Sequence, residues 1–227
     1  MSIDWNGIIL DAPSPAAAWT EIFAALLALS KATSSPVALH DATVVPDRLL
    51  AEAAWELWEA FPLQAETTAD HLKAWAAADP AGKAVLILDA LSLRELPIIL
   101  GAAETRGVEP VQVRVTGSAC PSTTDHFAKS LGLPGRSALA NNNKPGTLAL
   151  FGGDCYTEVV GLPFADCAVP PSPNLLFWHT WLDDLIHLQK KLPDQVATIA
   201  ADTLQSDGFW GFLDRLRQGR NLVITSD

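Results

Sequence analysis

The stretch Ala84-Val85-Leu86-Ile87-Leu88-Asp89 decides the fold class, because a short apolar run ends there on a carboxylate. A run of this length that contains β-branched residues predicts a buried strand starting near Lys83. Strands seldom end on an ionised side chain in a protein interior, since an unpaired buried charge is costly. In open α/β sheets, ligands gather at the carboxyl ends of parallel strands, so Asp89 is the first candidate site residue.

Strand and helix patterns alternate over residues 81–227. This alternation predicts an α/β domain with a mostly parallel sheet and helices on both faces. Helices are expected near residues 93–106 and 124–131, and a long one over 194–217 with a break at Gly208. Besides the strand that ends at Asp89, further strands are expected at residues 111–115, 147–151, 175–178 and 222–224.

Residues 1–80 carry helical patterns instead, which predicts a helical amino-terminal region ahead of the α/β domain. Ser14 is suited to cap a first helix, Pro46 to start a second, and Thr68 to start a third. The apolar residues 37–39 indicate a short strand within this region.

The composition narrows the classes of function. The chain has 227 residues, 49% of them hydrophobic, with 26 acidic and 15 basic residues and a net charge of −11. So much apolar content supports a buried core, while the negative charge leaves no basic stripe that would wrap nucleic acid. The sequence also lacks a GxxxxGK phosphate loop, a GxGxxG turn, an HExxH helix and a GxSxG elbow. If phosphate is bound here, metal ions are the expected carriers of positive charge.

Several features predict a cytoplasmic location and no membrane contact. Cys120, Cys155 and Cys167 are odd in number and have no CxxC spacing, so we expect reduced thiols. Asp4 stands where a signal peptide would need a positive charge. The most apolar helix pattern, over residues 16–29, is too short for a membrane span.

A polar segment at residues 121–126, Pro-Ser-Thr-Thr-Asp-His, precedes one of the expected helices. A hydroxyl such as that of Thr124 at this position can face a phosphate, or can act as a nucleophile if a metal or base lowers its pKa. Ser and Thr are also the commonest helix caps, and the motif taken alone favours that structural role.

Two further carboxylate motifs occur later in the chain. Asp183 and His187 are four residues apart, so on a helix they share a face and are placed to coordinate one metal ion. The alternative is a capping Asp and a half-buried His. The apolar run 222–224 leads to Asp227, whose alternative reading is a frayed acidic end.

These motifs, in this order, resemble the PglZ domain, a family of the alkaline phosphatase superfamily found in phage-defence systems of the BREX type and in some response regulators. The resemblance rests on residues 85–91, 121–124, the Asp183/His187 pair and 224–227, and it covers about residues 83–227. It implies an alkaline-phosphatase-like sheet and hydrolysis of phosphate esters.

The resemblance also implies the roles of individual residues. Thr124 would be the nucleophile and would ligate one metal together with Asp89 and Asp227, while Asp183 and His187 would hold a second metal. We expect two divalent ions, zinc by the mixed carboxylate and imidazole ligands, with manganese as the alternative.

The resemblance implies that the run Asn141-Asn142-Asn143 stands where related phosphodiesterases place one asparagine that steadies a phosphoryl oxygen. Which of the three is equivalent stays open, and Asn141 and Asn142 are taken as the substrate-binding candidates. The superfamily pattern continues after its last Asp with a His, whereas this sequence stops at Asp227. The domain over residues 81–227 is therefore expected to be truncated, either as a fragment or as a natural variant with an incomplete site.

Two functions follow as expectations. The first is a metal-dependent phosphoesterase or phosphodiesterase acting on a phosphate ester such as a nucleotide or nucleic acid, in phage defence. The alternative is a non-catalytic PglZ-like module that binds protein partners in a defence or signalling assembly.

Overall fold

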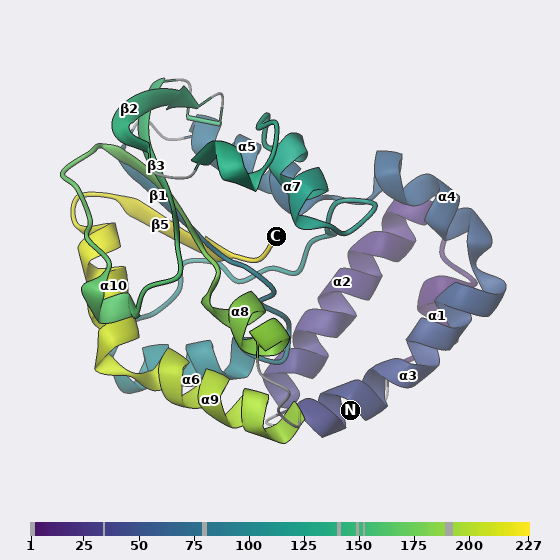
Figure 1. Cartoon of the computed structure of the whole chain (residues 1–227). Helices are drawn as coiled ribbons and strands as arrows, with labels where there is room; N and C mark the ends of the chain where they lie inside the picture. The colour runs from purple at the N-terminus through teal and green to yellow at the C-terminus, as the bar shows by residue number, and fades with distance from the viewer. Residues whose placement is uncertain are drawn as a thin grey trace. The chain divides into compact units, whose positions relative to one another are not determined.

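A five-stranded sheet lies at the centre of the α/β part of the chain (Figure 1). The computed structural model describes residues 3–33, 35–78, 81–139, 142–148, 150–151, 153–188 and 193–227. In these residues the strand order is β2-β3-β4-β1-β5. The strands are β1 (Lys83–Leu88), β2 (Asn142–Leu148), β3 (Gly153–Val160), β4 (Asn174–His179) and β5 (Asn221–Thr225).

Four of these strands are parallel. β1 pairs with β4 on one side and with β5 on the other, and β3 pairs with the far side of β4. β2 runs antiparallel to β3 at one edge. The expected α/β class with a mostly parallel sheet is therefore confirmed.

Helices and 3₁₀ turns occupy much of the rest of the described chain. Within that part, no helix is both long and apolar enough to cross a lipid bilayer. In chain order they are α1 (Trp5–Ile9), α2 (Pro15–Ala32), α3 (Pro36–Ala53), α4 (Trp55–Gln64), α5 (Thr68–Ala78), α6 (Leu96–Thr105), α7 (Thr124–Ser130), η1 (Arg136–Leu139), η2 (Phe164–Asp166), α8 (Trp181–Leu188), α9 (Pro193–Gln205) and α10 (Asp207–Arg217).

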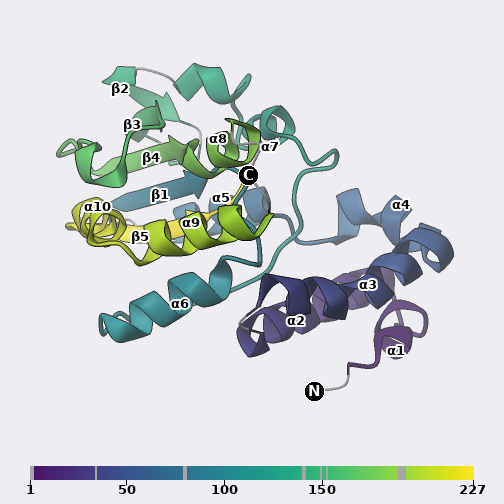
Figure 2. The same cartoon turned by 60° about the horizontal axis from the view of Figure 1, so that its bottom comes forward.

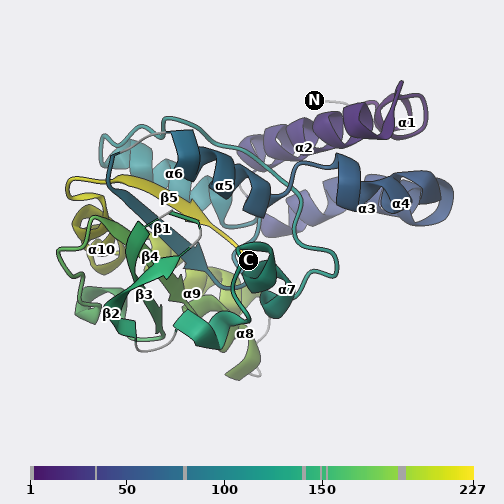
Figure 3. The ribbon, with the colours of Figure 1, turned by 90° about the horizontal axis from the view of Figure 1, so that it is seen from above.

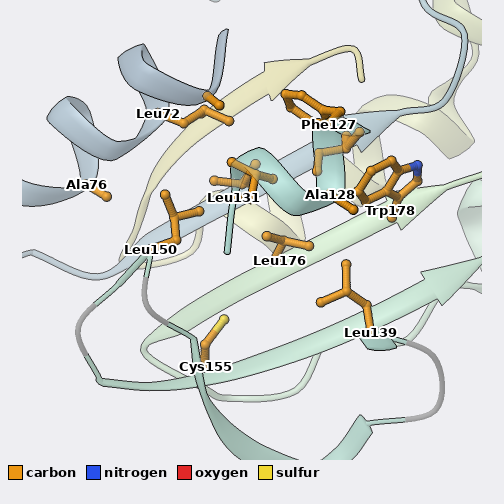
Figure 4. Close-up of a cluster of buried hydrophobic side chains, with 13 residues drawn as sticks. Leu72, Ala76, Phe127, Ala128, Leu131, Leu139, Leu150, Cys155, Leu176 and Trp178 are labelled. Carbon is orange, nitrogen blue, oxygen red and sulfur yellow. The ribbon is translucent and has the colours of Figure 1, made fainter. Parts of the chain in front are cut away.

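The sheet is covered by helices on both faces (Figure 2). All six residues of β1 are buried, because it is a central strand and both of its faces are packed. On one face, strand residues and residues of α5, α7 and η1 form a common apolar cluster (Figure 4). The cluster includes Leu72, Ala76, Val85, Ile87, Phe127, Leu131, Leu139, Leu176 and Trp178.

An aromatic cluster forms on the opposite face. The ring of Phe177 in β4 contacts Phe212 of α10, and Phe164 of η2 contacts Phe209 of the same helix. Aromatic rings bury large apolar areas and favour such edge-to-face contacts, so α10 is held firmly on this face. This confirms the expectation that helices lie on both faces.

A separate compact unit of helices comprises residues 1–67 and 93–117. Its core includes the buried residues Trp19, Ile22, Leu57 and Phe61, and the Trp19 indole donates to the carbonyl of Leu57 at 3.0 Å. The sheet unit comprises residues 68–92 and 118–227. These contact units differ from the expected domains 1–80 and 81–227, which stay a prediction as folding units. Helix α5 packs with the sheet, and α6 belongs with the helical unit.

Some local expectations were wrong. Residues 37–39 are helical, because Ser35 caps Pro36 and the following residues through a hydrogen bond from the Ala38 amide. Pro46 lies inside the same helix instead of starting one. Residues 111–115 form no strand, and Val111 is fully exposed, so this apolar run has no sheet to join. The break expected at Gly208 is confirmed near that residue, between α9 and α10.

Candidate functional site

Three strands end side by side at one edge of the sheet. The register aligns Leu88 with His179 of β4 and Ile87 with Thr225 of β5. Asp89 and Asp227 therefore leave the sheet from neighbouring strands at the same edge, as expected for the carboxyl ends of parallel strands. Figure 3 shows the chain end, marked C, beside helix α7.

Asp89 is a buried carboxylate with three partners. Its backbone amide continues the strand ladder by donating to the carbonyl of His179 at 3.0 Å. Its Oδ2 atom accepts a hydrogen bond from Trp178 Nε1 at 3.0 Å and forms an ion pair with Arg136 Nη1. Only 3% of the Asp89 side chain is exposed, so its charge depends on these partners.

Asp227 is positioned by a backbone amide and a hydroxyl. Its Oδ1 atom accepts from the amide of Ala90 at 3.1 Å, and its Oδ2 atom accepts from Thr124 Oγ1 at 2.7 Å. Ala90 has a left-handed backbone with φ of 65°. This conformation costs a side-chain-bearing residue about 1 kcal/mol and is often found at functional sites. The turn after β1 thus directs a backbone donor at Asp227.

The charge of Asp227 affects the protonation of Asp89. The pKa of Asp89 is raised to about 6, first by burial, and then by the charge of Asp227 and a hydrogen bond with it. Arg136 and Trp178 oppose this rise because they favour the ionised form. The guanidinium of Arg136 therefore offsets the effects of burial and of Asp227 on Asp89 only in part.

The adjacent threonines have different roles. Thr123 is the cap of α7: its Oγ1 atom accepts from the His126 amide at 3.4 Å and lies 2.7 Å from His126 Nδ1. Thr124 is the first residue of the helix, and its hydroxyl donates to Asp227 across 103 positions of sequence. Capping is thus performed by Thr123, which leaves the Thr124 hydroxyl to the carboxylate cluster.

Asp183 and His187 form a pair of their own on α8. His187 Nε2 lies 3.1 Å from Asp183 Oδ1, and 73% of the His187 side chain is exposed. In the described part of the chain, no hydrogen bond or ion pair joins this pair to Asp89, although Leu91 packs against the apolar cluster that contains Leu182 and Leu185 of the same helix. Among the described residues, no group of three or more His, Cys, Asp or Glu is arranged to hold one metal.

Only one of the two candidate asparagines lies within the described residues. Asn141 lies outside the described residues, and Asn142 opens β2, where its backbone pairs with Thr157. Their role in holding a phosphoryl oxygen stays a prediction.

The donor atoms at this sheet edge are of the kind that divalent cations bind. Asp89, Thr124 and Asp227 present only oxygen, which suits magnesium or manganese as well as zinc. Asp183 and His187 offer one carboxylate and one imidazole, the mixed set that zinc accepts. This second pair supplies only two protein ligands.

Sequence patterns missed Arg136 and Trp178. The expected strand over residues 175–178 includes Trp178, but local spacing does not connect Trp178 with Asp89, 89 positions away. No spacing signal connects Arg136 with Asp89, because their contact spans 47 positions and depends on how η1 packs.

Comparisons with models of protein families, with curated proteins and with solved structures found no match to this chain. Its function has to be inferred from the side chains gathered at this edge of the sheet.

Proposed function

We propose that this chain is a metal-dependent phosphoesterase or phosphodiesterase of the PglZ type, with Thr124 as its nucleophile. The observation that supports this most is the 2.7 Å hydrogen bond from Thr124 Oγ1 to Asp227 Oδ2, next to the buried Asp89. A hydroxyl beside two carboxylates at the end of parallel strands is suited to accept a metal and to attack a phosphate.

Each residue has a defined task in this proposal. Asp89, Asp227 and Thr124 would hold one divalent cation, which would lower the pKa of the hydroxyl and neutralise phosphoryl oxygens. The Thr124 proton passes to Asp227 Oδ2, and Oγ1 forms a bond to phosphorus while the bond to the leaving oxygen breaks. Water then cleaves the phosphothreonine and releases phosphate or a phosphomonoester.

The remaining expectations belong to the same proposal. Asp183 and His187 would hold a second cation, and Asn141 and Asn142 would contact a phosphoryl oxygen. Zinc is the favoured ion and manganese the alternative. We further propose a nucleotide or nucleic acid as substrate, in a cytoplasmic phage-defence complex.

Hydrolysis of bis(4-nitrophenyl) phosphate with added Mn²⁺ or Zn²⁺ tests the nucleophile. Thr124→Ala should lower the rate at least about a thousandfold, because the proposed covalent intermediate forms on the Thr124 hydroxyl. Thr123→Ala is the matched control. It removes the cap of α7, which costs about 1 kcal/mol of stability, but it should leave the rate within severalfold. Full activity in Thr124→Ala would rule out the nucleophile.

One observation favours the alternative, a non-catalytic interaction module. The charge of Asp89 already has Arg136 and Trp178 as partners, so part of the cost of burying it is offset without a cation. This alternative predicts no turnover by the wild-type chain with either metal, together with normal folding of Thr124→Ala.

A further inference from the structure

Arg136 is a site residue without a task in the proposed reaction. It opens η1, whose last residue, Leu139, is buried in the apolar cluster under the sheet edge. This anchor fixes the start of η1 near Asp89, while 33% of the Arg136 side chain remains exposed. The guanidinium therefore reaches both the buried carboxylate and the solvent.

Arg136 and a cation at Asp89 would compete for the negative charge of the same carboxylate. Asp89 Oδ2 accepts from both Trp178 Nε1 and Arg136 Nη1, and a carboxylate oxygen has two lone pairs. Trp178 is completely buried and has little freedom to leave. Arg136 has a long and partly exposed side chain, so it is the partner that a cation would displace.

A displaced guanidinium would have the phosphate of the substrate as a suitable new ligand. Thr124 and Arg136 both approach the same pair of carboxylates, Thr124 through Asp227 and Arg136 through Asp89. A phosphate attacked by Thr124 would thus lie within the neighbourhood of Arg136. The planar guanidinium fork matches two phosphate oxygens, and such charge-assisted bonds are among the strongest in proteins.

We propose that Arg136 binds the phosphoryl group of the substrate, and that its ion pair with Asp89 is the resting arrangement that a divalent cation opens. This inference rests on the proposed function and assigns Arg136 an oxyanion of a phosphate ester as its ligand. In the resting form Arg136 neutralises Asp89. In the loaded form the cation neutralises Asp89, and the guanidinium is released to the phosphate.

The exchange makes a specific thermodynamic prediction. Arg136 competes with the cation but assists the phosphate, so removing its charge should change the two affinities in opposite directions. A purely structural role would weaken both, because a distorted site binds neither ligand well. The sign of the two changes is therefore diagnostic.

The experiment measures Mn²⁺ binding by electron paramagnetic resonance, and binding of inorganic phosphate to the Mn²⁺-saturated protein by calorimetry. In Arg136→Gln we expect Mn²⁺ to bind about tenfold tighter and phosphate about ten- to hundredfold weaker. Arg136→Lys keeps the charge, so it should bind Mn²⁺ like the wild type and retain part of the phosphate affinity. Arg217→Gln is the control, since Arg217 pairs with Asp214 on the surface of α10 and should change neither affinity.

The outcomes separate this inference from the proposed function. If Arg136→Gln bound Mn²⁺ as tightly as the wild type does, and phosphate as tightly as the wild type does, the role of Arg136 would be overturned. The proposed metal site would be unaffected by that result. Weakening of both ligands in Arg136→Gln, with normal binding in Arg136→Lys, would also overturn the exchange. Absence of Mn²⁺ binding in the wild type and in both Arg136 variants would overturn the inference and the proposed metal-dependent function together.

Discussion

At the scale of single residues, the burial of Asp89 beside Asp227 has the clearest energetic consequence. Desolvation and a neighbouring carboxylate both favour the protonated form of Asp89, and Arg136 and Trp178 only partly offset them. A functional site that binds a cation can retain such a costly group, because the ligand supplies the missing charge.

The raised pKa predicts how stability depends on pH without metal. Below pH 4 Asp89 is protonated in both the folded and the unfolded chain. Between pH 4 and pH 6 the folded state keeps the proton that the unfolded state has lost, so the free energy of unfolding falls as pH rises through this range. The loss should reach at most about 3 kcal/mol. Urea unfolding at pH 4 to 7 in a chelating buffer measures it.

Asp89→Asn is the reference for this measurement, since the amide does not titrate. The difference in free energy of unfolding between wild type and Asp89→Asn should change between pH 4 and pH 6 and level off above that. A pH profile that is parallel in the two proteins would contradict the raised pKa.

At the scale of elements, the sequence pattern did not predict that helix α5 packs against the sheet. Its pattern resembles that of the preceding helices, but Ala69, Leu72 and Ala76 pack with Val85 and Ile87 of the central strand. The apolar face of a helix indicates that this face must be covered, but it does not identify the element that covers it.

This packing predicts a large effect of Leu72→Ala on the sheet. Leu72 is 1% exposed, and removing a buried leucine side chain typically costs about 2–5 kcal/mol through lost transfer energy and a cavity. Urea unfolding monitored by circular dichroism measures the change. Leu63→Ala in α4 is the matched control, because Leu63 is 90% exposed and should change stability by less than about 0.5 kcal/mol. Equal effects of the two substitutions would refute the packing of α5 on the sheet.

At the scale of the whole molecule, the candidate site connects segments that are far apart in the sequence. Asp89 follows β1, Thr124 starts α7, and Asp227 follows β5. A ligand held by all three would tie these segments together and bind only to the folded chain. Binding of this kind stabilises the folded state in proportion to the logarithm of ligand concentration.

Mn²⁺ or Zn²⁺ should therefore raise the Tm of the wild-type chain. At about 100 times the Kd the gain is about 2.7 kcal/mol, which corresponds to roughly 5–10 °C for a chain of this size. Scanning calorimetry with and without a chelator measures it. Asp227→Asn should lose most of the shift.

Asp183→Asn serves as the comparison, because its pair with His187 shows no described contact with the Asp89 cluster. It should retain the stabilisation that comes from the first cation. An equal Tm with and without metal in the wild type would argue against a cation at this sheet edge.

Much of the candidate site could be predicted from local sequence. An apolar run that ends on Asp89 predicts a buried strand with a carboxylate at its end, and the second run leads to Asp227 in the same way. Arg136 and Trp178 could not be predicted as partners of Asp89, because a contact across 47 or 89 positions leaves no trace in local spacing.

By itself, the sequence determined the class of fold and placed Asp89 and Asp227 at the ends of two strands. Strand and helix periodicity are local properties, and parallel strands must bring their carboxyl ends to one edge. Only the tertiary structure decided which of two adjacent threonines caps α7 and which reaches Asp227. It also decided that Arg136 neutralises Asp89, because the partner of a buried charge is selected by packing in three dimensions.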